Sequence, residues 1–340
     1  MSVAVTKSST RPWRGTRPTV GIFLATAILF VIGGIFVPQS VSSGAIYGML
    51  PFASILVIVS LGQTLVIQQA GIDLSAPGIV SLSAVLVCYG YANDPIGLGS
   101  VAPYLVAAMV TAACAGFISG CLVTKLAIAP IVATLGMNAL LYGLNMFISS
   151  GVPVPAPPSL TAFANGATFG INHLAYCALI LALLANFVVK ATVFGRTFEA
   201  VGASLRAARA AGIEADRYQI SAYVGAAALY AIAGILLGSL MQTPSTQQGD
   251  SYLMLSIAAT VLGGTSLFGG RGNLIATVVA AVFLTQLQQL VLTTGASLAV
   301  QYLFQGATIL LGVAVYGTNL GAVVRHFKLR STSARQDALS

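Results

Sequence analysis

Apolar residues occupy ten long stretches of the chain, separated by short polar segments. Each stretch has about the 20 residues that an α-helix needs to cross the hydrocarbon core of a bilayer. The stretches are 20–37, 45–68, 73–92, 102–124, 129–149, 172–190, 218–241, 252–267, 272–292 and 298–316. The pattern predicts an all-α integral membrane protein with about ten transmembrane helices. Polar and glycine-rich residues interrupt the third and eighth stretches, so the ends of these two are the least sharply defined.

Composition excludes a soluble domain. Only 6% of the residues are charged, 57% are hydrophobic, and the mean hydropathy is +0.93. Soluble domains carry roughly a quarter of charged residues, and so few charges could not cover the surface of 340 residues. The first apolar stretch follows a basic segment, as in a secretory signal. It is longer than a signal core and no clear cleavage site follows it, so we interpret it as an uncleaved first span.

The positive charges indicate the topology. All fifteen Lys and Arg residues precede the first stretch, follow the tenth, or lie between the fourth and fifth, sixth and seventh, or eighth and ninth stretches. Cytoplasmic loops of membrane proteins are enriched in Lys and Arg. We therefore expect both termini in the cytoplasm, with tails at 1–19 and 318–340 flanking a transmembrane domain at 20–317. The net charge of +8 reports this topology and does not indicate a nucleic-acid partner.

Nothing in the sequence indicates a metal, a cofactor or a catalytic residue. The four cysteines lie in apolar runs without a C-x-x-C pair, and the two histidines are isolated. The glycine run at 262–272 lacks the lysine of a phosphate-binding loop. The spans hold no acid/base pair and no nucleophile–histidine cluster, which argues against a membrane enzyme such as an acyl or glycosyl transferase.

The segment 191–217 is the one sizeable cytoplasmic loop that the topology predicts. Within it, "SLRAARAAG" (204–212) predicts a helix of about two turns, begun by Ser204 as N-cap and ended by Gly212. Two turns are not stable alone in water. The helix therefore packs on the membrane domain or binds a partner, with Arg206 and Arg209 on one face. A solvated connecting helix is the alternative interpretation.

Two interruptions break the apolar pattern. In "QQAGIDLSAPGIVSLSAV" (68–85), glycine, proline and Asp73 disfavour a continuous helix. We expect Asp73 either to cap a helix that begins near Ser75 or to contact a substrate or proton. The second interruption, at 262–272, lies roughly 190 residues later, and such pairs hint at an internal repeat of two halves around a pathway. Alternatively, glycines permit close helix packing, as expected for Gly116-x-x-x-Gly120 and Gly234-x-x-x-Gly238.

Amide side chains are frequent inside the predicted spans. An amide facing lipid lacks hydrogen-bond partners, so most of them face inward and together favour a hydrophilic seam for a neutral solute. Hydrogen bonding between helices is the alternative for any single amide. We expect Gln63 and Asn138 to lie nearer a pathway than lipid. The candidate pathway residues are Gln63, Gln68, Asp73, Asn138, Asn145, Gln286 and Gln289.

Four blocks of sequence resemble one family. They are "LGQTLVIQQAGIDLSAPGIVSLSA" (62–84), "KLAIAPIVATLGMNALLYGL" (125–144), "GRTFEAVGASLRAARAAGIEADRYQISAY" (195–223) and "IAATVLGGTSLFGGRGNLIATVVAA" (257–281). In this order they are similar to the membrane permease subunits of sugar-type, ribose/xylose-like ABC importers. The resemblance covers about residues 45–316. Permeases for branched-chain amino acids share the architecture, but their signatures match less well.

The resemblance implies a permease of the bacterial inner membrane that imports a small neutral solute, most simply a monosaccharide. It implies three kinds of partner: cytoplasmic ATP-binding subunits, a periplasmic solute-binding protein, and a second permease in a homo- or heterodimer. ATP hydrolysis would lie on the separate subunits. The loop at 191–217 would dock on them through a coupling helix, with candidate coupling residues Arg196, Glu199, Ser204, Arg206, Arg209 and Gly212.

The chain departs from the family pattern near the first interruption. Gln68 and Gln69 replace small or apolar residues, and Ala70 replaces a glycine. These changes leave the identity of the solute open. A secondary transporter that uses Asp73 as a proton or sodium site is the other transport class, and the lack of further acids inside the spans argues against it.

Overall fold

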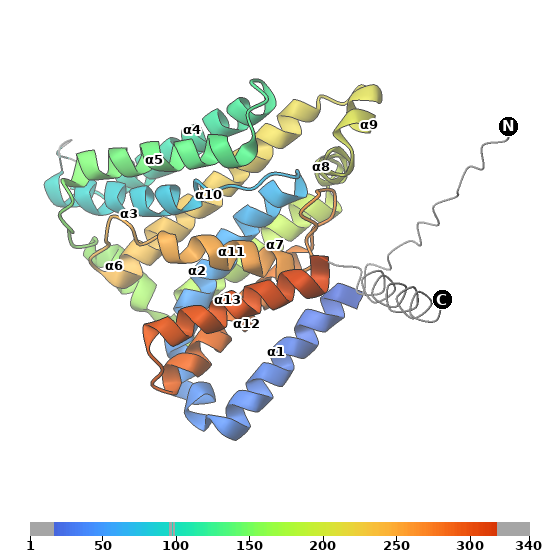
Figure 1. Ribbon diagram of the computed structural model, residues 1–340. Helices are drawn as coiled ribbons and strands as arrows, with labels where there is room; N and C mark the ends of the chain where they lie inside the picture. The colour runs from blue at the N-terminus through green and yellow to red at the C-terminus, as the bar shows by residue number, and fades with distance from the viewer. Residues whose placement is uncertain (1–16, 95–96, 98, 318–340) are drawn as a thin grey trace, which may run out of the picture.

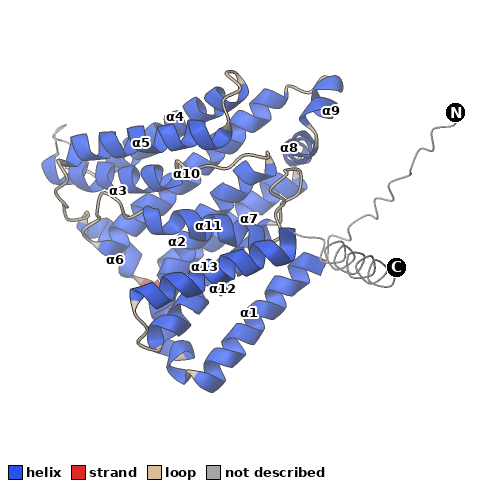
Figure 2. Ribbon diagram, viewed as in Figure 1, coloured by secondary structure: helices blue, strands red, loops and turns tan. Residues whose placement is uncertain are grey.

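The computed structural model describes residues 17–94, 97 and 99–317, so the predicted tail at 318–340 and residues 1–16 of the other tail lie outside the described residues (Figure 1). The described chain is built of helices, with one hairpin of two-residue strands, β1 (Ala167–Thr168) and β2 (Ile171–Asn172) (Figure 2). The helices are α1 (Arg17–Phe36), η1 (Pro38–Val41), α2 (Ser43–Gln68), α3 (Ala76–Asn93), α4 (Ala102–Thr124), α5 (Pro130–Ser149), α6 (Pro158–Asn165), α7 (His173–Ala191), α8 (Val193–Ala203), α9 (Leu205–Ala210), α10 (Ala215–Met241), α11 (Asp250–Leu262), α12 (Leu274–Thr293) and α13 (Leu298–Gly317).

The all-α membrane architecture is confirmed. Among the described residues, eight helices are long and apolar enough to cross a membrane: α1, α2, α3, α4, α5, α7, α10 and α12. Helix α13 has 20 residues and coincides with the predicted tenth span, 298–316. The predicted eighth span, 252–267, is wrong in extent, because α11 has 13 residues and ends at Leu262. At 1.5 Å per residue it is about 20 Å long, too short for a ~30 Å bilayer core.

Glycine ends α11 early. The chain after Leu262 turns through 263–273, where Gly264, Gly269 and Gly270 have positive φ, a conformation that glycine adopts without steric cost. Helix α3 begins at Ala76, three residues inside the predicted apolar stretch and next to Ser75, where the helix was predicted to begin. Pro77 lies in its first turn, where a missing N–H costs nothing. The residues 69–75 before it are not helical, and both predicted interruptions are therefore breaks in the helices.

Helices α2 and α10 form the centre of the bundle. Helix α2 packs against α7, α10, α11 and α12, and α10 packs against α3 and α4 as well. Figure 1 shows α3, α4 and α5 on one side of this pair and α1, α12 and α13 on the other. A Cβ on Gly116 of α4 would lie 2.6 Å from the carbonyl oxygen of Tyr223, and one on Gly234 of α10 would overlap the backbone of Val80. The predicted close packing at these two glycine motifs is confirmed.

The two ends of the bundle differ in charge. We call one of them the basic end; it carries α8, α9 and the cations Lys125, Lys190, Arg196, Arg206, Arg209, Arg217 and Arg271. Helix α6 and the β-hairpin follow α5 at the opposite end (Figure 1). By the positive-inside bias the basic end faces the cytoplasm.

Candidate functional site

Two short helices form the surface of the basic end. The hydroxyl of Ser204 accepts a hydrogen bond from the Ala207 N–H at 3.3 Å and caps α9, and Gly212 has φ +77° just beyond it. The predicted helix at 204–212 is thereby confirmed. Helix α8 was missed, although Thr192, whose hydroxyl accepts from the Gly195 N–H at 3.1 Å, is a typical N-cap residue.

One face of α8 and α9 packs on the bundle. Phe198, Val201 and Ala208 are buried. The ring of Phe194 on α8 stacks on that of Tyr218 on α10 and lies tilted against that of Phe198. This packing supplies the support that two turns of helix cannot provide for themselves. The opposite face of both helices is exposed.

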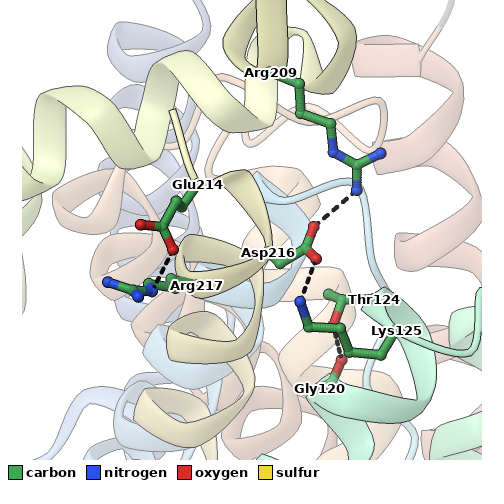
Figure 3. Close-up of polar contacts among 7 residues, drawn as sticks. All are labelled: Gly120, Thr124, Lys125, Arg209, Glu214, Asp216 and Arg217. Atoms are coloured by element: carbon green, nitrogen blue, oxygen red, sulfur yellow. Dashed lines mark hydrogen bonds and ion pairs between the residues drawn. The ribbon is translucent and has the colours of Figure 1, made fainter. Parts of the chain in front are cut away.

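Asp216 ties three segments together at the basic end. Its carboxylate accepts a hydrogen bond from the Arg209 guanidinium at 2.8 Å and from the Lys125 ammonium at 2.8 Å (Figure 3). Because Asp216 begins α10, Arg209 lies on α9 and Lys125 follows α4, this fork fixes α9 against two spans. A separate pair joins Arg217 to Glu214 at 2.6 Å.

The predicted coupling residues therefore divide into two groups. Ser204 caps α9, Gly212 ends it, Arg209 joins Asp216, and Glu199 forms an ion pair with Lys190. By contrast, Arg196 and Arg206 are exposed and make no ion pair within the part of the chain that the structure describes. The first group holds the helices in place, and a coupling role for Arg196 and Arg206 stays a prediction.

The two interruptions meet beneath α8. The Gly270 N–H donates to the carbonyl oxygen of Gln68 at 2.8 Å, and a Cβ on Gly202 of α8 would overlap that same oxygen. The Gln69 amide donates to the carbonyl oxygen of Phe198 at 2.8 Å. Thus the last turn of α2, the 263–273 loop and α8 form one junction, which we call the Gln68 junction. The Gln68 side chain is buried there, against the backbone of Gly272.

Asp73 is buried within the first interruption. One of its carboxylate oxygens accepts from the N–H of Ser75 at 2.9 Å and from the Ser75 hydroxyl at 2.6 Å. Ser75 is the N-cap of α3, so Asp73 braces the start of this helix through the cap residue instead of capping its first turn directly. Its second oxygen has no hydrogen-bond partner among the described residues.

The predicted amides join neighbouring helices. Gln63 accepts from the Tyr230 hydroxyl at 2.7 Å, and Asn138 accepts from the Gly78 N–H at 2.8 Å. The Asn145 amide donates to the carbonyl oxygen of Thr246 at 2.7 Å. The Gln286 amide donates to the Ser40 carbonyl oxygen at 3.4 Å, and Gln289 is half-buried. Both Gln63 and Asn138 face protein, and a role of the set in a pathway stays a prediction.

A cluster of three threonines was missed by the sequence analysis. The hydroxyl of Thr64 on α2 lies 3.2 Å from that of Thr260 on α11 and 3.2 Å from that of Thr277 on α12. Thr260 also donates to the Ser60 carbonyl oxygen. Threonine is common in apolar helices, and nothing in its local sequence singles out these three. Their contacts fasten α2 to the short helix α11 on one side and to α12 on the other.

Comparisons with known proteins agree with this architecture. The family model described as branched-chain amino acid transport system / permease component matches residues 45–313. The autoinducer 2 import system permease protein LsrC of Yersinia pseudotuberculosis serotype O:3 (strain YPIII) is 34% identical over 302 residues, or 88% of this chain and 85% of the relative. Its counterpart in Yersinia pestis (strain Pestoides F) has the same identity and coverage. No solved structure matches this chain.

These matches extend over nearly all of the membrane domain, well beyond the four sequence blocks that carry the resemblance. The relatives are permease subunits of ABC transporters and not enzymes, and the ATPase is a separate subunit. The chain belongs to the family of branched-chain amino acid transport system permease components, as a multi-pass inner-membrane permease subunit of an ABC importer.

Proposed function

We propose that this permease imports a small neutral, hydroxylated solute, with a monosaccharide or a molecule of the autoinducer 2 kind as the leading candidates. Two permease chains line the pathway, a periplasmic binding protein delivers the solute, and cytoplasmic ATP-binding subunits drive the cycle. The observation that carries the ATP-driven part of the proposal is the Gln68 junction, which connects the exposed helices of the basic end to the central helix α2.

The contacts of α8 and α9 suit them to transmit movement. The Asp216 fork fixes α9 to α4 and α10, and the Gln69 amide fixes α8 to the end of α2. A displacement applied to the exposed faces therefore reaches three spans through hydrogen bonds and packed backbone. Energy from ATP arrives through these helices, because the permease chain itself has no phosphate-binding loop.

The docking surface includes an exposed aromatic ring. Phe268, in the 263–273 loop, has 91% of its side chain exposed at the basic end. Phe268 and Leu205 of α9 line the same cavity of about 290 Å³. Aromatic and Arg side chains are enriched in the anchoring positions of protein interfaces. We infer that Phe268 and Arg206 together meet the ATP-binding subunit.

Two observations favour a neutral solute over an amino acid. The relatives are named for autoinducer 2 import. In addition, Asp73 is the one buried charged side chain in the described part of the chain, and it is engaged with Ser75. A zwitterion has two charges that need partners when they leave water, and the interior of the bundle supplies none for its carboxylate.

Charge reversal tests the docking proposal. We expect Arg206→Glu to weaken binding of the ATP-binding subunit about tenfold, because an attraction becomes a repulsion at an interface. Arg217→Glu is the matched control, since Arg217 lies at the same end but pairs with Glu214. The measurement is co-purification titrated with salt, together with solute-stimulated ATP hydrolysis. Equal, normal coupling in both variants contradicts the proposal.

A further inference from the structure

A cavity of about 270 Å³ lies between α2, α10, α11 and α12. Its volume is equivalent to about nine water molecules at ~30 Å³ each, and it is close to the lower end of small-ligand sites, about 300 Å³. None of the candidate pathway residues predicted from the sequence lines it. The lining residues are Phe52, Leu56, Leu237, Met241, Gln248, Ser251, Tyr252, Leu255, Thr285 and Gln288.

The cavity lies away from the basic end. Leu237 and Met241 belong to the last two turns of α10, and Phe52 lies nearer the start of α2 than its basic end at Gln68. Gln288 likewise lies in the second half of α12, which begins next to the basic 263–273 loop. The cavity is thus on the side from which an importer receives its solute.

Four polar residues line the cavity, and one of them, Gln248, lacks partners for its side chain. The Ser251 hydroxyl donates to the carbonyl oxygen of Gln248 at 3.4 Å, and the Thr285 hydroxyl donates to that of Ala281 at 2.9 Å. The amide nitrogen and oxygen of Gln248 are both buried and have no hydrogen-bond partner among the described residues. A primary amide offers two donors and a carbonyl acceptor, and leaving these buried and unpaired is costly. Ser251 and Gln288 add further donors and acceptors on the same lining. A ligand with several hydroxyl groups satisfies such a set, whereas a lipid chain does not.

The cavity carries no charge. No acidic or basic residue is among those that line it, and Phe52 and Tyr252 contribute aromatic rings. Ligand sites combine apolar and aromatic walls with a few polar groups that fix orientation. This lining matches the C–H faces and hydroxyl groups of a neutral polyol, and it offers neither an ammonium nor a carboxylate group a counter-charge.

The polar side of the cavity is held rigidly. Residues 242–249 precede α11, and three contacts fix them or the start of the helix. Asn145 donates to the carbonyl oxygen of Thr246, the Gly249 N–H donates to the Ser81 hydroxyl at 3.0 Å, and the Tyr142 hydroxyl donates to Asp250. Gln248 is therefore presented from a braced turn at the start of a short helix, a type of position that transporters use for solute sites.

We propose that this cavity is a binding site for the solute within one permease, with Gln248 and Gln288 as its specificity-determining residues. The inference rests on the proposed function and deepens it. All of its lining residues belong to a single chain, so each permease of a pair has its own site, and the solute would be bound there after release by the binding protein. Gln248 and Gln288 form hydrogen bonds with the hydroxyl groups of the solute, and the rings of Phe52 and Tyr252 pack on its apolar face.

The test uses the complete importer with its ATP-binding subunits and binding protein in proteoliposomes. The probes are radiolabelled D-ribose, D-xylose, autoinducer 2 and L-leucine. We expect Gln248→Leu and Gln288→Leu each to reduce the initial uptake of the transported probe about five- to tenfold, since each loses hydrogen bonds to the solute. Gln247→Leu is the matched control, because Gln247 is the adjacent residue, has the same side chain and is exposed. We expect its uptake within twofold of the wild type.

A second measurement does not depend on turnover. In Ser251→Cys, a hydrophilic thiol reagent should label the chain beyond the background of the four native cysteines measured in the wild type, and the transported probe should slow this additional labelling severalfold. The wild-type importer can transport a probe with ATP while the uptake by Gln248→Leu equals that by Gln247→Leu and the probe does not slow labelling of Ser251→Cys. In that case the cavity inference is wrong and the proposed function stands. If the wild type transports none of the hydroxylated probes, both are wrong.

Discussion

Replacing Gly202 by alanine should loosen the connection between the basic end and α2. A Cβ at this position would overlap the carbonyl oxygen of Gln68 and lie 3.0 Å from the backbone nitrogen of Gly270. Both atoms belong to backbone, so neither can rotate away, and α8 has to move off the Gln68 junction. Overpacking of this kind costs about 1–3 kcal/mol. We expect a lower melting temperature and, more specifically, weaker coupling of ATP hydrolysis to uptake.

The assay compares Gly202→Ala with Gly136→Ala. Gly136 lies in the exposed face of α5, and a Cβ there would meet nothing within 4 Å. Alanine is the better helix former by about 1 kcal/mol, so this control should be neutral or slightly stabilising. The readouts are thermal unfolding in detergent and the ratio of solute taken up to ATP hydrolysed in proteoliposomes.

Thermal unfolding and the ratio of uptake to ATP hydrolysis test different properties of the junction. If Gly202→Ala unfolds earlier but couples normally, the junction is structural and does not transmit movement. If Gly202→Ala behaves like Gly136→Ala in both measurements, the close contact between α8, α2 and the 263–273 loop does not exist as described. Either result removes the basis for assigning the junction a mechanical role.

Three further predictions follow from particular contacts. Tyr230→Phe should cost about 0.5–2 kcal/mol in detergent unfolding, because it removes the donor to the buried Gln63 oxygen; no loss would show that another donor reaches this oxygen. Thr260→Val should lower stability by about 0.5–1 kcal/mol in the same assay by freeing α11 from α2, and an unchanged variant would mean that packing alone holds α11. Asp216→Asn should cost under about 1 kcal/mol, since its ion pairs are partly exposed, yet it should speed proteolysis between residues 204 and 212; unchanged cleavage would contradict the role of the fork.

The membrane architecture is readable from the sequence because its causes are local. Some 20 apolar residues are required to cross a bilayer whatever the neighbouring helices do, and the cap at Ser204 and the turn at Gly212 depend on single residues. The break at 69–75 is likewise predicted by residues that disfavour a helix. The start of α3 next to Ser75 is predicted as well, whereas the contact of Asp73 with the cap residue Ser75 is seen only in the structure.

The roles of the polar residues depend on distant segments and were not readable in the same way. Whether an amide faces a cavity or a neighbouring helix is decided by what packs opposite it: Gln63 meets Tyr230 from a helix 167 positions away. Gln248 was not among the candidates, because it lies in a polar loop, where a glutamine is expected to be solvated. Only the fold shows that this loop lies against a cavity. The early end of α11 was signalled by the glycine-rich interruption at 262–272, into which the predicted span 252–267 wrongly extended.

Uptake with and without the ATP-binding subunits tests the central claim most directly. The permease is reconstituted in proteoliposomes alone, or with its ATP-binding subunits, binding protein and ATP, and entry of a hydroxylated probe is measured under an imposed proton or sodium gradient. The account predicts uptake only in the complete, ATP-supplied system, with no response to the gradient. Gradient-driven accumulation by the permease alone, abolished by Asp73→Asn, would contradict it and establish a secondary transporter.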